Sequence, residues 1–159
     1  MHGRRSSFLL FLGFTACLNQ ARGAAAVQES ATELNLNTRF GRMEMALERV
    51  AAKEREEFIR VHKGWGGRVR IADCELAGLR MTTKEEAEVS VRVAWYSPDE
   101  QELRQTTLRQ TWHDHKGDWL LEKETRIDGD VGLMGEKIVP VAAPHRENTQ
   151  FPTVRLGDD

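Results

Sequence analysis

Two histidines stand two residues apart in the segment His113-Asp114-His115. Residues two apart on an extended strand point to the same side, so both imidazoles reach the same region of space. Imidazole is a common zinc ligand, but two histidines supply only half of a tetrahedral shell. The segment also adjoins a polar turn, where solvated side chains are expected. This pattern favours an exposed strand end over a metal site, and we expect neither a metal nor another cofactor.

Asp73 is the acid that best suits general base catalysis, because it stands where a strand pattern slips and a side chain can be turned into a cavity. If the protein is an enzyme, Asp73 and His113 would act together as acid and base. The simpler interpretation is that Asp73 is a turn-favouring acid that lets the strand kink and bonds to nearby backbone. We favour the simpler interpretation and assign no catalytic residue.

Three tryptophans suit the wall of an apolar ligand pocket, because an indole is a large apolar surface with one polar N–H group. They are Trp95, Trp112 and Trp119. Trp95 continues an alternating apolar stripe, which favours packing in the core, and the other two flank a hairpin. The free thiol of Cys74 fits a small apolar strand residue better than a nucleophile.

The stronger catalytic motifs are missing from the sequence. It has no Ser-His-Asp arrangement, no glycine-rich phosphate loop and no Cys-x-x-Cys pair. The formal net charge of −2 gives no broad cationic field, so nucleic acid is not an expected partner. These observations leave binding and interaction as the leading class of function.

The first 26 residues predict an export signal. Arg4 and Arg5 precede an apolar run that is too short to span a bilayer, and small residues follow it. The tetrapeptide Phe14-Thr15-Ala16-Cys17 resembles a bacterial lipobox, which implies cleavage before Cys17 and acylation of its thiol. Ordinary cleavage after Gly23 or Ala26 is the alternative. We therefore expect an exported protein, periplasmic and lipid-anchored at Cys17, or else secreted.

The remaining periodicities predict one α+β domain over residues 36–128. Apolar residues spaced by three and four from about residue 33 to residue 63 indicate an amphipathic helix, interrupted near Gly41. Alternating patterns then predict strands at about 68–81, 86–96, 103–115 and 119–127, with a bulge near Ala72-Asp73. The helix is expected to lie on the concave face of a curved four-stranded antiparallel sheet.

The segments on either side of this domain have weaker patterns. Residues 27–35 are expected to form a leader, and residues 129–159 are expected to form a loose or disordered tail, because glycines and prolines interrupt their periodicity. A short contact of Leu133-Met134 or of Ile138-Val139 with the domain is an open alternative.

The segment from 36 to 127 resembles the NTF2-like and cystatin-like α+β rolls, and among them small exported proteobacterial proteins and lipoproteins. The resemblance lies in the stretch Ala87-Glu88-Val89-Ser90-Val91-Arg92-Val93-Ala94-Trp95-Tyr96 and in a closing hairpin from Leu108 to Glu122. These motifs are structural, so the resemblance implies a fold and no reaction.

The expected function is that of a non-catalytic exported module that binds an envelope protein or a small apolar ligand. The alternatives are a small cone-type enzyme, isomerase-like or hydrolase-like, that uses Asp73 and His113, and a structural subunit of an envelope assembly.

Overall fold

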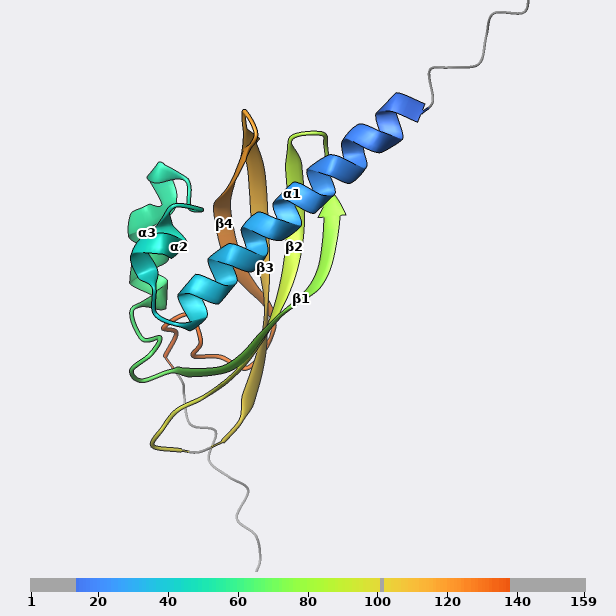
Figure 1. Ribbon diagram of the computed structural model, residues 1–159. Helices are drawn as coiled ribbons and strands as arrows, with labels where there is room; N and C mark the ends of the chain where they lie inside the picture. Colours follow the sequence, from blue (N-terminus) through green and yellow to red (C-terminus); the bar gives the residue numbers. More distant parts are fainter. Residues whose placement is uncertain (1–13, 101, 138–159) are drawn as a thin grey trace, which may run out of the picture.

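A computed structural model describes residues 14–100 and 102–137 (Figure 1). Its long helix lies across one face of a four-stranded antiparallel sheet with the strand order β1-β2-β3-β4. The elements in chain order are α1 (Phe14–Arg39), α2 (Met43–Leu47), a 3-10 turn η1 (Ala52–Glu54), α3 (Arg55–His62), β1 (Arg70–Met81), β2 (Glu86–Tyr96), β3 (Arg104–His115) and β4 (Asp118–Gly129). The predicted α+β class and the curved antiparallel sheet are confirmed.

The strands form because their apolar residues alternate. In β2 every second side chain from Ala87 to Trp95 is buried, and the residues between them are half-buried or exposed. The hairpin between β3 and β4 turns at Lys116 and Gly117, which both have positive φ values of 62° and 103°. This is the backbone that a tight two-residue hairpin turn requires.

Irregular pairing bends the sheet. The register of β1 against β2 shifts between Ile71 and Asp73, which confirms the predicted bulge, and shifts again between Leu76 and Gly78. Two further shifts lie between β3 and β4, where β4 has one extra residue at Glu122 and another at Ile127. Each extra residue reverses the inward and outward positions that follow it along the strand.

Helix α1 extends further toward the N-terminus than the sequence pattern indicates. Residues 27–35, expected to form a leader, are helical, and Val27, Ala31 and Leu34 are fully buried. These three residues lie three and four positions apart, so they form one apolar stripe that faces the sheet. Alanines and polar residues surround this stripe, so its apolar periodicity is weak in the sequence. The described part of the predicted export signal is residues 14–26, which are also helical, while residues 1–13 lie outside the described residues.

The predicted interruption of the helical region near Gly41 is present. Helix α1 ends at Arg39, and Gly41, with a φ of 69°, turns the chain toward the short helices α2 and α3, so the part up to residue 63 is not one helix. Between them, Leu121 of β4 donates its N–H to the carbonyl of Arg49 and accepts a bond from the N–H of Ala51, at 2.8 and 2.9 Å. The stretch between α2 and η1 therefore covers part of the outer edge of β4.

The core lies between α1, α3 and the concave face of the sheet. All three tryptophans considered as pocket walls belong to it, with exposures of 1%, 0% and 2% for Trp95, Trp112 and Trp119. The Nε1 atom of Trp95 donates to Thr106 Oγ1 at 2.8 Å, so its polar group is satisfied inside the protein.

A turn after β4 closes one end of the core. Leu133 is fully buried, Met134 packs against the core, and the carbonyl of Leu133 accepts a hydrogen bond from Trp65 Nε1 at 2.9 Å. The alternative contact of Leu133-Met134 with the domain is therefore present. The prediction of a loose tail from residue 129 is therefore wrong for residues 129–137, because Leu133 is buried in the core. The rest of the predicted tail, residues 138–159, lies outside the described residues.

Candidate functional site

A chain of four polar side chains runs through the apolar core. They come from four different elements: Asn35 on α1, Gln110 on β3, Glu124 on β4 and His62 on α3. Asn35, Gln110 and His62 are 6%, 0% and 2% exposed, and the Glu124 side chain is 5% exposed. Buried polar groups are costly unless they are paired, so the arrangement of these four groups determines what the interior can bind or hold.

The first part of this chain is a reciprocal pair of amides. Gln110 Nε2 donates to Asn35 Oδ1 at 2.9 Å, and Asn35 Nδ2 donates to Gln110 Oε1 at 3.2 Å. Asn35 Nδ2 also donates to the carbonyl of Ala31 at 2.7 Å, and Trp112 Nε1 donates to Gln110 Oε1 at 3.3 Å. This pair holds α1 to the middle of the sheet.

The second part is a carboxylate and an imidazole. Gln110 Nε2 donates to Glu124 Oε1 at 2.7 Å, and the other oxygen, Oε2, lies 3.0 Å from His62 Nε2. Despite this short distance, Oε2 has no hydrogen-bond partner of good geometry in the described residues. We therefore describe the approach of His62 to Glu124 as a close charge contact and not as an aligned hydrogen bond.

The partner of the other ring nitrogen orients the imidazole. His62 Nδ1 lies 2.8 Å from the carbonyl oxygen of Phe58, and a carbonyl only accepts, so Nδ1 carries a proton. Nε2 is then the ring nitrogen that faces the Glu124 carboxylate.

Aromatic rings hold the imidazole in place. The ring of Phe58 stacks on His62 with centroids 4.0 Å apart, and the ring of Trp65 meets it edge to face at 4.5 Å. The spacing of Phe58 and His62 by four residues places both on the inner face of α3. His62 thus contacts two aromatic rings and has little freedom to rotate.

A small hollow lies beside this pair, between α3, β4 and the turn after β4. Its volume is about 70 Å³. Five of its lining residues are apolar, namely Val50, Phe58, Val61, Leu121 and Met134. The other four are charged, namely Glu54, Glu57, Lys123 and Glu124. Ligand pockets for drug-sized molecules are roughly 300–1,000 Å³, so this hollow suits water or a group of a few atoms.

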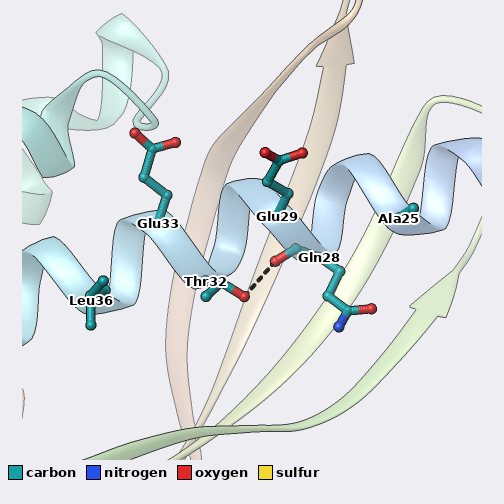
Figure 2. Close-up of a pocket in the computed structure, with 6 residues that line it drawn as sticks. All are labelled: Ala25, Gln28, Glu29, Thr32, Glu33 and Leu36. Atoms are coloured by element: carbon teal, nitrogen blue, oxygen red, sulfur yellow. Dashed lines mark hydrogen bonds between the residues drawn. The ribbon is translucent and has the colours of Figure 1, made fainter.

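A larger hollow of about 690 Å³ lies along α1, but it has no opposing wall. Its lining residues all belong to this one helix, from Ala25 to Leu36. Figure 2 shows Gln28, Glu29 and Thr32 on turns of α1 that cross in front of the strands. We interpret this hollow as an open surface of the helix.

Asp73 and His113 are not brought together by the fold. Asp73 pairs with Ala94 of β2 and His113 with Glu86, positions that are roughly 26 Å apart along the strand. The Asp73 side chain is 66% exposed and forms an ion pair with Arg39 Nη1 at 2.9 Å. The aspartate therefore ties the bulge of β1 to the end of α1.

His113 and His115 share one side of β3, as the sequence spacing predicts, with ring centroids 5.0 Å apart. Each lies near a different glutamate: His113 Nδ1 is 3.9 Å from Glu86, and His115 Nε2 is 3.6 Å from Glu122. Across residues 14–100 and 102–137, no three or more His, Cys, Asp and Glu side chains are grouped to hold a metal ion.

Cys74 lies near the buried polar chain. Burial raises the pKa of its thiol to about 12, with the negative charge of Glu124 adding to the increase. A thiol of this kind is neutral at physiological pH and a poor nucleophile. The side chain of Cys17, the predicted lipidation site, lies outside what the structure describes.

The buried polar chain was not predicted from the sequence. Gln110 occupies an inward position between Leu108 and Trp112, so the alternation of β3 alone marks it as a polar group in the core. Glu124 could not be found by alternation, because the extra residue at Glu122 reverses the pattern of β4. For His62, the sequence offered only its spacing from Phe58, which places both residues on the same face of a helix.

Neither a protein-family model nor a curated protein matches this chain. Among solved structures, it is similar to the solution structure of RPA3114, a SEC-C motif containing protein from Rhodopseudomonas palustris. The two share 12% sequence identity with a TM-score of 0.50, over 58% of this chain and 72% of that one. At this identity the similarity concerns the fold alone.

None of the helices in the described part of the chain combines the length and the apolar composition that a membrane-spanning helix needs.

Proposed function

We propose that this chain is an exported, lipid-anchored and non-catalytic binding module of the cell envelope, facing the periplasm and built on an NTF2-like or cystatin-like roll. The fold proposal is supported by the helix that lies across a curved four-stranded antiparallel sheet. The export proposal is supported by the cationic start, the short apolar run and the lipobox that ends at Cys17.

The packing of α1 before Val27 is the observation that carries the anchoring proposal. A Cβ atom added at Gly23 would lie 3.3 Å from Met81 Cε, so the helix approaches the sheet closely at this point. Ala26 also packs against the core. Cleavage before Cys17 keeps these contacts in the mature protein.

Cleavage further along the chain would remove them. A cut after Ala26 would make Val27 the first residue, and Val27 is fully buried. Its new ammonium group would need solvation at a place where the side chain packs in the core, which is costly. A cut after Gly23 would remove the contact with Met81. The fold therefore supports acylation at Cys17 over both alternatives.

The anchor would be short and stiff. Cys17 lies six residues before Gly23 within the same helix, which corresponds to about 9 Å of rise. A lipid on Cys17 would hold the domain close to the membrane surface, with the helix as the connection.

Exposed apolar residues at the other end of α1 suit a protein partner. Leu36 and Phe40 are 48% and 59% exposed, and the guanidinium groups of Arg39 and Arg42 each lie 5.6 Å from the Phe40 ring. An apolar patch bordered by arginines fits an envelope protein with apolar and acidic side chains.

Membrane fractionation of cells expressing the full-length chain tests the anchoring. We expect the wild-type protein in the membrane fraction, extractable by detergent and not by high salt. The variant Cys17→Ser should lose lipid modification, while Cys74→Ser, as a matched control, should remain anchored. A wild-type protein found wholly in the soluble periplasmic fraction would contradict the proposal.

A second candidate function is favoured by the buried pair of His62 and Glu124. An imidazole and a carboxylate 3.0 Å apart can exchange a proton, as a small acid–base enzyme requires. This version of the enzyme hypothesis replaces Asp73 and His113, which lie far apart. It also requires the small hollow to open, because its 70 Å³ cannot hold a substrate of ordinary size.

A further inference from the structure

The hollow between α3 and β4 combines apolar walls with one buried acid. Phe58 and Val61 of α3 line it on one side, and Leu121 of β4 lines it on another. Glu124, also on β4, lines the hollow as well, and its side chain is 5% exposed. A site of this kind suits a small group with a polar head and a short apolar end.

Glu124 has unused capacity to accept hydrogen bonds. A carboxylate offers about four acceptor positions on its two oxygens. Gln110 Nε2 fills one on Oε1, and Oε2 has no well-aligned donor among the described residues, with His62 Nε2 in charge contact at 3.0 Å. A buried carboxylate oxygen with a free lone pair is stabilised by an N–H donor, and most strongly by a charged one.

The charges around the hollow favour a cation. Glu54 and Glu57 line it together with Glu124, and Lys123 is the one basic residue among the lining residues. Arg60 forms an ion pair with Glu57 outside the lining. With Glu57 paired, Glu54 and Glu124 are the acids of the lining that an incoming positive group meets, against the one base Lys123.

We propose that this hollow is a binding site for a small primary ammonium with a short alkyl group. The ammonium donates to Glu124, and the alkyl carbons lie against Phe58 and Leu121. With a volume of about 70 Å³, the hollow admits a ligand of about three heavy atoms. The proposal goes beyond the binding module suggested above and does not depend on the anchor at Cys17.

Titration of the purified mature protein with ethylammonium chloride tests the site. Amide chemical shifts in ¹H–¹⁵N NMR spectra should change saturably for residues of α3 and β4, such as Val61 and Leu121. A ligand of three heavy atoms gains limited free energy, so the expected Kd is about 1 mM or weaker. Tetramethylammonium chloride at the same concentration has the charge but no N–H donor and should produce no saturable change.

Two variants locate the binding. Glu124→Gln keeps the size of the side chain and removes the charge, so it should weaken ethylammonium binding at least about tenfold. Glu56→Gln changes an exposed acid of α3 that does not line the hollow, and its Kd should equal that of the wild type. If Glu124→Gln does not fold, Val61→Leu serves instead, because the added methylene occupies the hollow and should also weaken binding.

Two results would overturn the proposal. One is a wild-type protein whose spectra change with ethylammonium no more than with tetramethylammonium, which would mean that the hollow accepts water only. The other is a folded Glu124→Gln or Val61→Leu variant that binds ethylammonium as tightly as the wild type.

Discussion

His62 Nε2 lies 3.0 Å from Glu124 Oε2, and these two almost wholly buried side chains join helix α3 to strand β4. The Phe58 carbonyl fixes a proton on His62 Nδ1, so Nε2 is the ring nitrogen that faces the carboxylate. Its partners Gln110 and Asn35 extend the connection to β3 and α1. Four elements thus meet at one polar chain inside an apolar core.

Removing the imidazole should destabilise the protein strongly. His62→Ala leaves the Glu124 carboxylate buried without its charge partner, and breaking a buried pair in this way costs about 3–5 kcal/mol. The free energy of unfolding from urea titration measures this effect. His115→Ala, which alters a half-exposed histidine near Glu122, should change stability by less than about 0.5 kcal/mol.

Replacing both members of the pair should recover part of the loss. A His62→Phe, Glu124→Leu double variant leaves no unpaired charge, so it should be more stable than His62→Ala. A His62→Ala variant within about 1 kcal/mol of the wild type would show that the pair does not hold α3 on the sheet.

The sheet fold follows from the sequence more closely than the helical region does. The pattern of β2 predicted its bounds because apolar and polar residues alternate without interruption. The bulge at Asp73 was also visible as a change of phase. Helix α1 was placed too late, because its buried residues Val27 and Ala31 lie among small and polar residues that resemble a leader.

The buried polar chain could not be assembled from the sequence, because its members lie far apart along the chain and meet through tertiary packing. The extra residue at Glu122 turns Glu124 inward, against the alternation that Trp119 and Leu121 begin. Conversely, Asp73 and His113 were chosen because of the residues next to them in the sequence. Such local patterns contain no information on the distance between the two residues in the fold.

Gly129→Ala should be among the most damaging single changes. Gly129 has a φ of +84°, and a Cβ atom there would lie 2.2 Å from the carbonyl oxygen of Gln105. Both the backbone strain and the clash oppose a side chain, so we expect a loss of more than about 2 kcal/mol in thermal or urea unfolding.

Gly66→Ala provides the matched control for this effect. Gly66 has a similar φ of +78° but nothing within 4 Å of the added Cβ, so only strain of about 1 kcal/mol should appear. Equal losses for the two variants would contradict the role given to the close approach of Gly129 to β3.

Cys74 should resist alkylation in the folded protein. With a pKa raised to about 12, mainly by burial, its thiolate fraction at pH 8 is about 1,000-fold below that of an ordinary thiol. Iodoacetamide treatment of a Cys17→Ser chain, followed by intact mass, should therefore show slow labelling that becomes fast in urea. Native labelling as rapid as that of free cysteine would mean that Cys74 is accessible and ionised.

The turn after β4 should loosen in acid. Burial alone would raise the pKa of Glu136, but hydrogen bonds from its own backbone, from Arg126 and from the N–H groups of Met134 and Gly132 together lower it. A lowered pKa stabilises the fold above the unfolded value, near 4.3, and this stabilisation is lost as the pH falls through the folded value.

Glu136→Gln tests this contribution. The variant should be less stable than the wild type at pH 7, and the difference should shrink as the pH falls below 4. Fluorescence of Trp65, which donates to the carbonyl of Leu133 in the same turn, reports the loosening. A stability difference that does not change with pH would contradict the charge-based explanation.

The intact mass of the mature protein, purified from the membranes of a bacterial host, decides whether Cys17 is acylated. We expect a chain that begins at Cys17 and carries a diacylglyceryl group, with or without a further acyl chain on its amino group. A soluble, unmodified chain that begins at Ala24 or Val27 would contradict this expectation, and would show that α1 begins only where the core does.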